Sequence, residues 1–193
     1  MNKIKTKYPP GDFAIWIIIY IELLTFGLFF IGYIYSRRGD IELFNASQTL
    51  LDQRLGFINT IILLTSSYFV VKAVNIIKSI NTKEAFDKAS RYLIGAIGLG
   101  GIFLVLKMSE FVGKYGQGIN LSTNKFFMFY FLLTMFHFLH VLLGMIILYN
   151  LQQKTKLGGY TKDEHKGLET GASYWHMVDL LWIVLFPLIY IIR

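Results

Sequence analysis

Cysteine is absent from this sequence, and histidine occurs only four times. The lack of cysteine excludes disulfide bonds, thiolate zinc sites, iron–sulfur clusters and cysteine-ligated copper centres. Any transition metal on this chain would need histidine ligands, and four are too few for a binuclear centre together with a low-spin haem. Composition alone therefore limits any metal or haem ligation on this chain to its few histidines.

The composition also lacks the polar surface of a water-soluble domain. Hydrophobic residues make up 54% of the 193 residues, and the mean hydropathy is +0.51. The net charge of +7 could indicate nucleic acid, but the basic residues lie between apolar runs and form no stripe with interleaved aromatic residues. We expect a membrane protein with no nucleic-acid partner.

Five apolar runs are each long enough to cross a hydrocarbon layer of about 30 Å as a helix. They cover residues 13–35, 57–77, 92–108, 126–151 and 172–192. The first run is too long for a secretory signal and ends without a small-residue cleavage site, so we interpret it as a retained helix. The sequence predicts an all-α integral membrane protein, with a cytoplasmic segment over 1–12 and a single five-helix bundle over 13–193.

The basic residues predict the orientation of these helices, because cytoplasmic loops are enriched in Lys and Arg. Eleven lie on one side: Lys3, Lys5, Lys7, Lys78, Lys83, Lys88, Arg91, Lys154, Lys156, Lys162 and Lys166. Six lie on the other: Arg37, Arg38, Arg54, Lys114, Lys125 and Arg193. Lys72 and Lys107 lie near helix ends and are expected to snorkel. We expect a cytoplasmic N-terminus and a periplasmic or extracellular C-terminus.

Ionisable side chains inside the predicted helices are the candidate functional residues, because each costs a few kcal/mol at membrane depth and usually finds a partner. They are Glu22, His137, His140, His176 and Asp179, with Glu110 near a helix end. Counting about 1.5 Å per residue from the helix ends places Glu22, His140 and Asp179 at similar depth, where they could form one buried layer. Each of the pairs His137/His140 and His176/Asp179 is three residues apart and can share a helix face.

Three interpretations of these residues stay open. The simplest is hydrogen bonding between helices, which stabilises the bundle. The second is haem ligation between helices, for which His140 and His176 match in depth, although large aromatic side chains flank both. The third is an ion or proton path through Glu22 and Asp179, as in a small independent transporter.

The last two runs resemble the closing helices of the haem-copper oxidase subunit III family. The segment FFMFYFLLTMFHFLHVLLGMIIL carries the pattern F-H-x-L-H-V, and ETGASYWHMVDLLWIVLFPLIYIIR carries W-H-x-x-D-x-x-W. The segment INTIILLTSSYFVVKAV is similar to the family's N-T-x-x-L-L-x-S-S helix. The segment LKMSEFVG resembles the family's segment that carries a glutamate after the next helix. The first helix, IWIIIYIELLTFGLFFIGYIY, is similar to the family's helix with a buried acidic residue ahead of an aromatic run. The chain lacks the two additional N-terminal helices of seven-helix members, as do the shorter members of bacterial quinol oxidases.

This resemblance implies a subunit without haem or copper, and so with no catalytic residue, no cofactor-binding residue and no metal ligand of its own. Such a subunit packs on the catalytic subunit, holds lipid in a cleft and supports proton uptake. The six candidate residues then have structural, lipid-support or proton-support roles. The missing helices form one wall of the cleft in longer members, so a full cleft is not expected here. Bound phospholipid remains an expectation, and haem and copper belong on a partner chain.

The function that follows is a non-catalytic subunit III-type component of a bacterial haem-copper terminal oxidase, using cytochrome c or quinol, in aerobic respiratory electron transport. Its expected location is the bacterial cytoplasmic membrane. One alternative is an accessory membrane protein of a nitric oxide reductase system, because the last two helices look closest to that branch of the family. The other alternative is the independent proton-coupled transporter.

Overall fold

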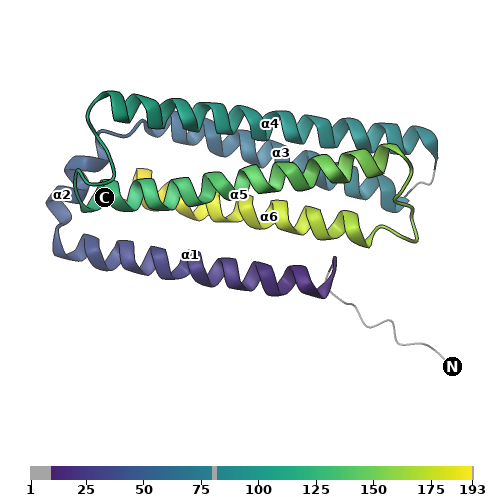
Figure 1. Cartoon of the computed structure of the whole chain (residues 1–193), viewed down its shortest axis with the longest axis horizontal. Helices are drawn as coiled ribbons and strands as arrows, with labels where there is room; N and C mark the ends of the chain where they lie inside the picture. Colours follow the sequence, from purple (N-terminus) through teal and green to yellow (C-terminus); the bar gives the residue numbers. More distant parts are fainter. Residues whose placement is uncertain (1–9, 80–81, 193) are drawn as a thin grey trace.

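A computed structural model describes residues 10–79 and 82–192, and these residues form helices and short connections. Figure 1 shows the long helices running roughly along one common direction, with a short helix across one end. They are α1 (Phe13–Gly39), α2 (Ile41–Gln48), α3 (Gln53–Ser79), α4 (Lys83–Gly116), α5 (Lys125–Lys156) and α6 (Lys166–Phe186), followed by the π-helix η1 (Pro187–Ile191). Lys3, Lys5, Lys7 and Arg193 of the topology count lie outside the described residues, as do residues 1–9 of the expected N-terminal segment.

Five of these helices are long and apolar enough to cross a membrane, which confirms the predicted all-α membrane bundle. They extend further than the apolar runs indicate. The helix expected over 92–108 is α4, which has 34 residues and begins at Lys83. It spans about 51 Å, against a hydrocarbon layer of about 30 Å. Hydropathy detects only the part of the helix in hydrocarbon, because its ends carry charged residues.

The helix starts follow from the side chains that precede them. The carboxylate of Asp12 accepts a hydrogen bond from the backbone of Phe13, and the hydroxyl of Thr82 accepts one from Ala85. The amide oxygen of Asn124 accepts one from Phe127. Each supplies an acceptor for a backbone N–H that has no partner in the first turn.

Helices α5 and α6 form the centre of the bundle (Figure 1). Helix α6 packs on α1, α3 and α5, while α4 packs on α3 and α5. Helix α1 lies on the opposite side of the bundle from α4. Its outward face is apolar and exposed, as a lipid-facing or partner-facing helix requires.

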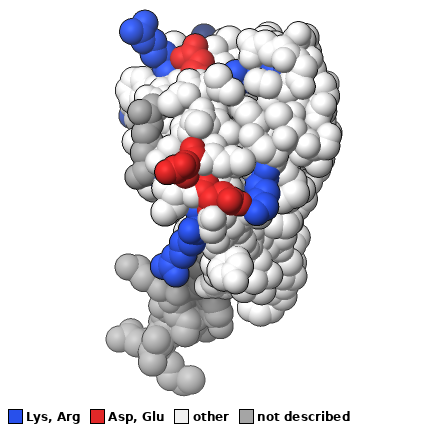
Figure 2. Space-filling view, turned by 90° about the vertical axis from the view of Figure 1, so that its left-hand side faces the viewer, with Lys and Arg blue, Asp and Glu red and all other residues white. Residues whose placement is uncertain are grey.

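The short helix α2 was not predicted, because its eight residues are too few to cross a membrane. It packs across the bundle end where α1 finishes, and its Gln48 side chain donates 2.8 Å to the carbonyl of Ile189 in η1. The Asn124 amide that caps α5 also donates 2.9 Å to the hydroxyl of Ser47. Figure 2 faces this end and shows acidic and basic side chains beside one another on a mostly uncharged surface. One such pair joins Lys125 to Asp40 at 2.6 Å.

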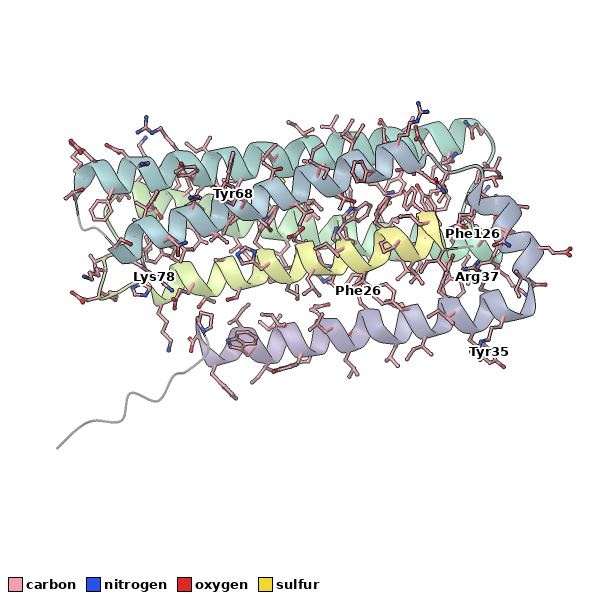
Figure 3. The ribbon with its side chains drawn as sticks, turned by 180° about the vertical axis from the view of Figure 1, so that it is seen from behind. Phe26, Tyr35, Arg37, Tyr68, Lys78 and Phe126 are labelled. Atoms are coloured by element: carbon pink, nitrogen blue, oxygen red, sulfur yellow. The ribbon has the colours of Figure 1, made fainter. Side chains whose placement is uncertain are left out.

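The opposite end of the bundle is held by the residues just before α1. The N–H of Gly11 donates 3.2 Å to the carboxylate of Glu169, which also pairs with Lys78 from the end of α3 (Figure 3). Gly11 has a φ of +89°, and a Cβ there would stand 3.1 Å from the backbone of Thr170. The close approach of the chain to α6 therefore needs glycine at this position.

Candidate functional site

A lysine and a glutamate of α4 form an ion pair in the interior of the bundle. The Nζ of Lys107 lies 2.9 Å from Oε2 of Glu110, with the two side chains 0% and 5% exposed. The hydroxyls of Tyr130 in α5 and Tyr190 in η1 each donate 2.8 Å to the other carboxylate oxygen. Lys107 also donates to the Tyr190 hydroxyl at 2.5 Å. These four side chains, the Lys107 cluster, join α4, α5 and the C-terminal π-helix.

Aromatic rings enclose the ammonium group of Lys107. It lies about 5 Å from four ring centroids, at distances that favour cation–π attraction. The rings are Phe111 at 5.3 Å, Tyr130 at 4.9 Å, Trp182 at 5.4 Å and Tyr190 at 5.1 Å. The expectation that Lys107 snorkels to the interface is therefore wrong. Its charge stays inside because a carboxylate, a hydroxyl and ring faces replace the water that it would otherwise need.

A second polar contact joins α1 to α5. Oε2 of Glu22 lies 3.0 Å from Nε2 of His140, and Nδ1 of the same ring lies 2.7 Å from the carbonyl oxygen of Phe136. Phe26, which points from α1 into the bundle in Figure 3, packs edge-on against this imidazole with ring centroids 5.5 Å apart. Both ring nitrogens of His140 are thus engaged within the protein, so this geometry favours hydrogen bonding between helices over haem ligation.

His137 faces a different part of the bundle from His140. It is fully buried, with its ring 5.1 Å from Trp182 and 5.8 Å from Phe103. Neither of its ring nitrogens has a hydrogen-bond partner among the described residues. Although only three residues apart, the two histidines contact different helices, with His137 toward α4 and α6 and His140 toward α1.

Asp179 forms no direct bond with Glu22 or His140, the two residues with which it was expected to form a buried layer. Asp179 is 8% exposed, and its Oδ1 has no hydrogen-bond partner among the described residues; the same holds for Oγ of Ser67. His176 is half-buried. Groups of this kind in a buried setting are usually satisfied by ordered water.

The residues missed at the sequence level are Lys107, Tyr130 and Tyr190. The ion pair could have been predicted from the three-residue spacing of Lys107 and Glu110, which places opposite charges on one helix face. The tyrosines gave no such signal, because they lie 20 and 80 residues from Glu110 in the chain. Among residues 10–79 and 82–192, no group of three or more His, Cys, Asp or Glu side chains is arranged to hold a metal ion.

Comparison with known proteins shows which family this bundle belongs to. The family described as Cytochrome c oxidase subunit III matches residues 12–193. Cytochrome c oxidase subunit 3 of Thermostichus vulcanus is 32% identical over 172 residues, which cover 89% of this chain and 82% of that protein. The probable quinol oxidase subunit 3 of Staphylococcus saprophyticus is 27% identical, with 92% of this chain and 86% of that protein covered.

Some relatives are considerably longer. Cytochrome c oxidase subunit 3 of Synechocystis sp. is 34% identical over 143 residues, and these cover 74% of this chain but only 58% of that protein. The matched region thus makes up little more than half of that protein's length.

Proposed function

This chain belongs to the cytochrome c oxidase subunit III family, and we propose that it serves as the non-catalytic subunit III of a haem-copper terminal oxidase in aerobic respiration. The observation that carries this proposal is the family match over residues 12–193, which includes all five membrane-spanning helices. Haem and copper would be held by the catalytic partner subunit.

The buried polar contacts support a structural role for this chain. Glu22 and His140 engage each other across α1 and α5, and Glu110 is occupied by Lys107 and two tyrosine hydroxyls. Side chains that satisfy one another stabilise a fixed bundle. Such a bundle can present constant helix faces to a catalytic subunit and to lipid, and can support proton uptake there without carrying out a reaction.

We place the protein in the bacterial cytoplasmic membrane with its N-terminus in the cytoplasm. Basic residues at the end of the bundle where α4 begins support this orientation, because the positive-inside rule counts Lys and Arg near span ends. They include Lys78, Lys83, Lys88, Arg91, Lys154, Lys156 and Lys166.

The catalytic partner subunit would determine whether the electron donor is cytochrome c or quinol. The relatives include subunits named for each of these two kinds of oxidase. A nitric oxide reductase partner is the alternative within the same class of function. The two proposals differ in the gas that the purified complex would consume, which is dioxygen for an oxidase and nitric oxide for a nitric oxide reductase.

Deletion of this subunit from the native membrane tests the proposal. We expect the remaining oxidase to keep its haem spectrum and to lose activity progressively during turnover, with recovery when the full chain is expressed again. An oxidase whose turnover and lifetime are unchanged by the deletion would contradict the supporting role.

A further inference from the structure

Two cations and two aromatic rings line a pocket between α3 and α4, with a volume of about 370 Å³. Phe69 comes from α3, and Lys88, Arg91 and Tyr92 come from α4. The rings of Phe69 and Tyr92 stand 5.7 Å apart in an edge-on arrangement. Gly95 makes room for Phe69, because a Cβ at this position would stand 2.9 Å from its ring. We call these four lining residues the α3–α4 pocket.

The depth of the α3–α4 pocket matches the boundary between hydrocarbon and headgroups. A hydrocarbon layer of about 30 Å centred on α4 would leave about 10 Å of this helix outside each surface. Lys88 and Arg91 lie about 8 Å and about 12 Å from the start of α4 at Lys83. In a layer centred in this way, their charged groups would stand at the level of the phospholipid phosphates.

The two cations carry charge that no ion pair neutralises within residues 10–79 and 82–192. Neither Lys88 nor Arg91 forms an ion pair with a described residue, whereas Lys78, Lys107, Lys125 and Lys166 all do. The first two turns of α4 contain Glu84 and Asp87, but neither carboxylate comes within ion-pair distance of a cation in the described part of the chain.

A third cation stands on the neighbouring helix, one turn from Phe69. The ammonium group of Lys72 lies 5.2 Å from the ring centroid of Tyr68, which is labelled on α3 in Figure 3. Because α3 and α4 are antiparallel neighbours joined by a short connection, Lys72 lies at about the same depth as Arg91, roughly 10 Å from the end of its helix. Lys72 does not line the pocket, but it adds a positive charge on α3 at similar depth.

We propose that the α3–α4 pocket binds the phosphate of an anionic phospholipid, with Arg91 and Lys88 as the phosphate ligands. A guanidinium group binds phosphate through two parallel hydrogen bonds, and lysine adds a point charge. Basic pockets between membrane helices suit the headgroups of such lipids. The acyl chains would follow the apolar exposed residues of α4 further along the same helix, which include Ile94, Ile102 and Val105.

This lipid site is separate from the helix pair α1 and α5 that holds Glu22 and His140, because α4 packs on α3 and α5 and α1 packs on α5 and α6. It depends only on this chain and a bilayer. Its test is therefore independent of which oxidase, if any, the chain supports.

Native mass spectrometry of the full-length protein tests the proposal, after exchange into detergent with equal amounts of phosphatidylglycerol and phosphatidylcholine. We expect preferential retention of phosphatidylglycerol. Each cation near an anionic lipid contributes about fivefold in affinity. The variant Lys88→Gln/Arg91→Gln should therefore retain phosphatidylglycerol about 25-fold more weakly.

The matched control is Lys83→Gln/Lys162→Gln, which removes two exposed cations from the same end of the molecule without altering the pocket. We expect the control to retain lipid as the unmodified chain does. Equal losses in both double variants would overturn the proposal, since they would show a general charge effect. Equal retention of the two lipids by the unmodified chain would also overturn it.

Discussion

Lys107 and Glu110 lie one helical turn apart on α4 and form an ion pair that is almost completely enclosed by the bundle, with Nζ and Oε2 2.9 Å apart. An enclosed ion pair is costly to form because both charges lose water, and still more costly to break on one side. Here the partners Tyr130 and Tyr190 belong to α5 and to the C-terminal π-helix. The pair therefore ties the end of the chain to the middle of the bundle.

Replacing one member of the pair should destabilise the protein strongly. We expect Glu110→Gln to lower the free energy of unfolding by about 3–5 kcal/mol, because Lys107 would keep a buried charge without a counter-ion. The double variant Lys107→Met/Glu110→Gln should lose less than the sum of the two single variants, since the second change removes that charge. Thermal unfolding in detergent measures both effects.

Lys72→Met is the control for this series, because Lys72 is an exposed lysine within a membrane helix. We expect its effect to stay within about 0.5 kcal/mol. Strict additivity of the two single variants would show that Lys107 and Glu110 do not interact as described.

The contact between Glu22 and His140 should hold α1 against the bundle. Glu22→Ala removes a bond to a partly buried imidazole, which we expect to cost about 1–3 kcal/mol. Helix α1 should then sample positions further from α5. Spin labels on cysteines introduced at the exposed positions Ile31 and Leu139 would report this as a population at longer distances.

The labelling is specific because the natural sequence contains no cysteine. The exposed acid Glu42 on α2 provides the control, and Glu42→Ala should leave the distance distribution unchanged. A distribution that is equally unaffected by Glu22→Ala would mean that apolar packing alone positions α1.

Close packing between α5 and α6 should make Gly144 intolerant of any side chain. A Cβ at this position would stand 2.8 Å from the indole ring of Trp175, which is itself almost fully buried. We expect Gly144→Ala to cost about 1–3 kcal/mol, because a rigid ring in a filled interior cannot move aside cheaply. Thermal unfolding of the purified chain measures the change.

Gly98 on α4 is the matched control, since a Cβ there would meet no atom within 4 Å. Gly98→Ala should be neutral or should stabilise the protein by up to about 1 kcal/mol, because alanine restricts the unfolded chain. Equal effects at the two glycines would argue against close packing between α5 and Trp175.

The sequence was sufficient to predict the five spans, because a run of about 20 apolar residues has few other stable conformations. It did not predict where the helices end. The start of α4 at Lys83 lies beyond the apolar run, in a charged segment that forms helix because Thr82 caps it. Helix α2 escaped detection because it is short and lies on the end of the bundle.

The polar residues of the bundle were found by type, but their partners were not. Glu22, His140 and Asp179 were assigned similar depths, yet only Glu22 and His140 bond to each other directly in the described part of the chain. Depth along a helix says nothing about the direction in which a side chain points around it. Lys107 was assigned to the interface for the same reason, although its side chain is directed inward toward Tyr190.

The most direct test of the central claim uses an affinity tag on this chain and purification from native membranes in mild detergent. The account predicts that a larger haem protein is isolated with it, with a visible haem spectrum and oxygen consumption supported by cytochrome c or quinol. The same chain expressed alone should show neither. A stable, monodisperse chain that is isolated from native membranes without any haem protein would contradict its assignment as an oxidase subunit.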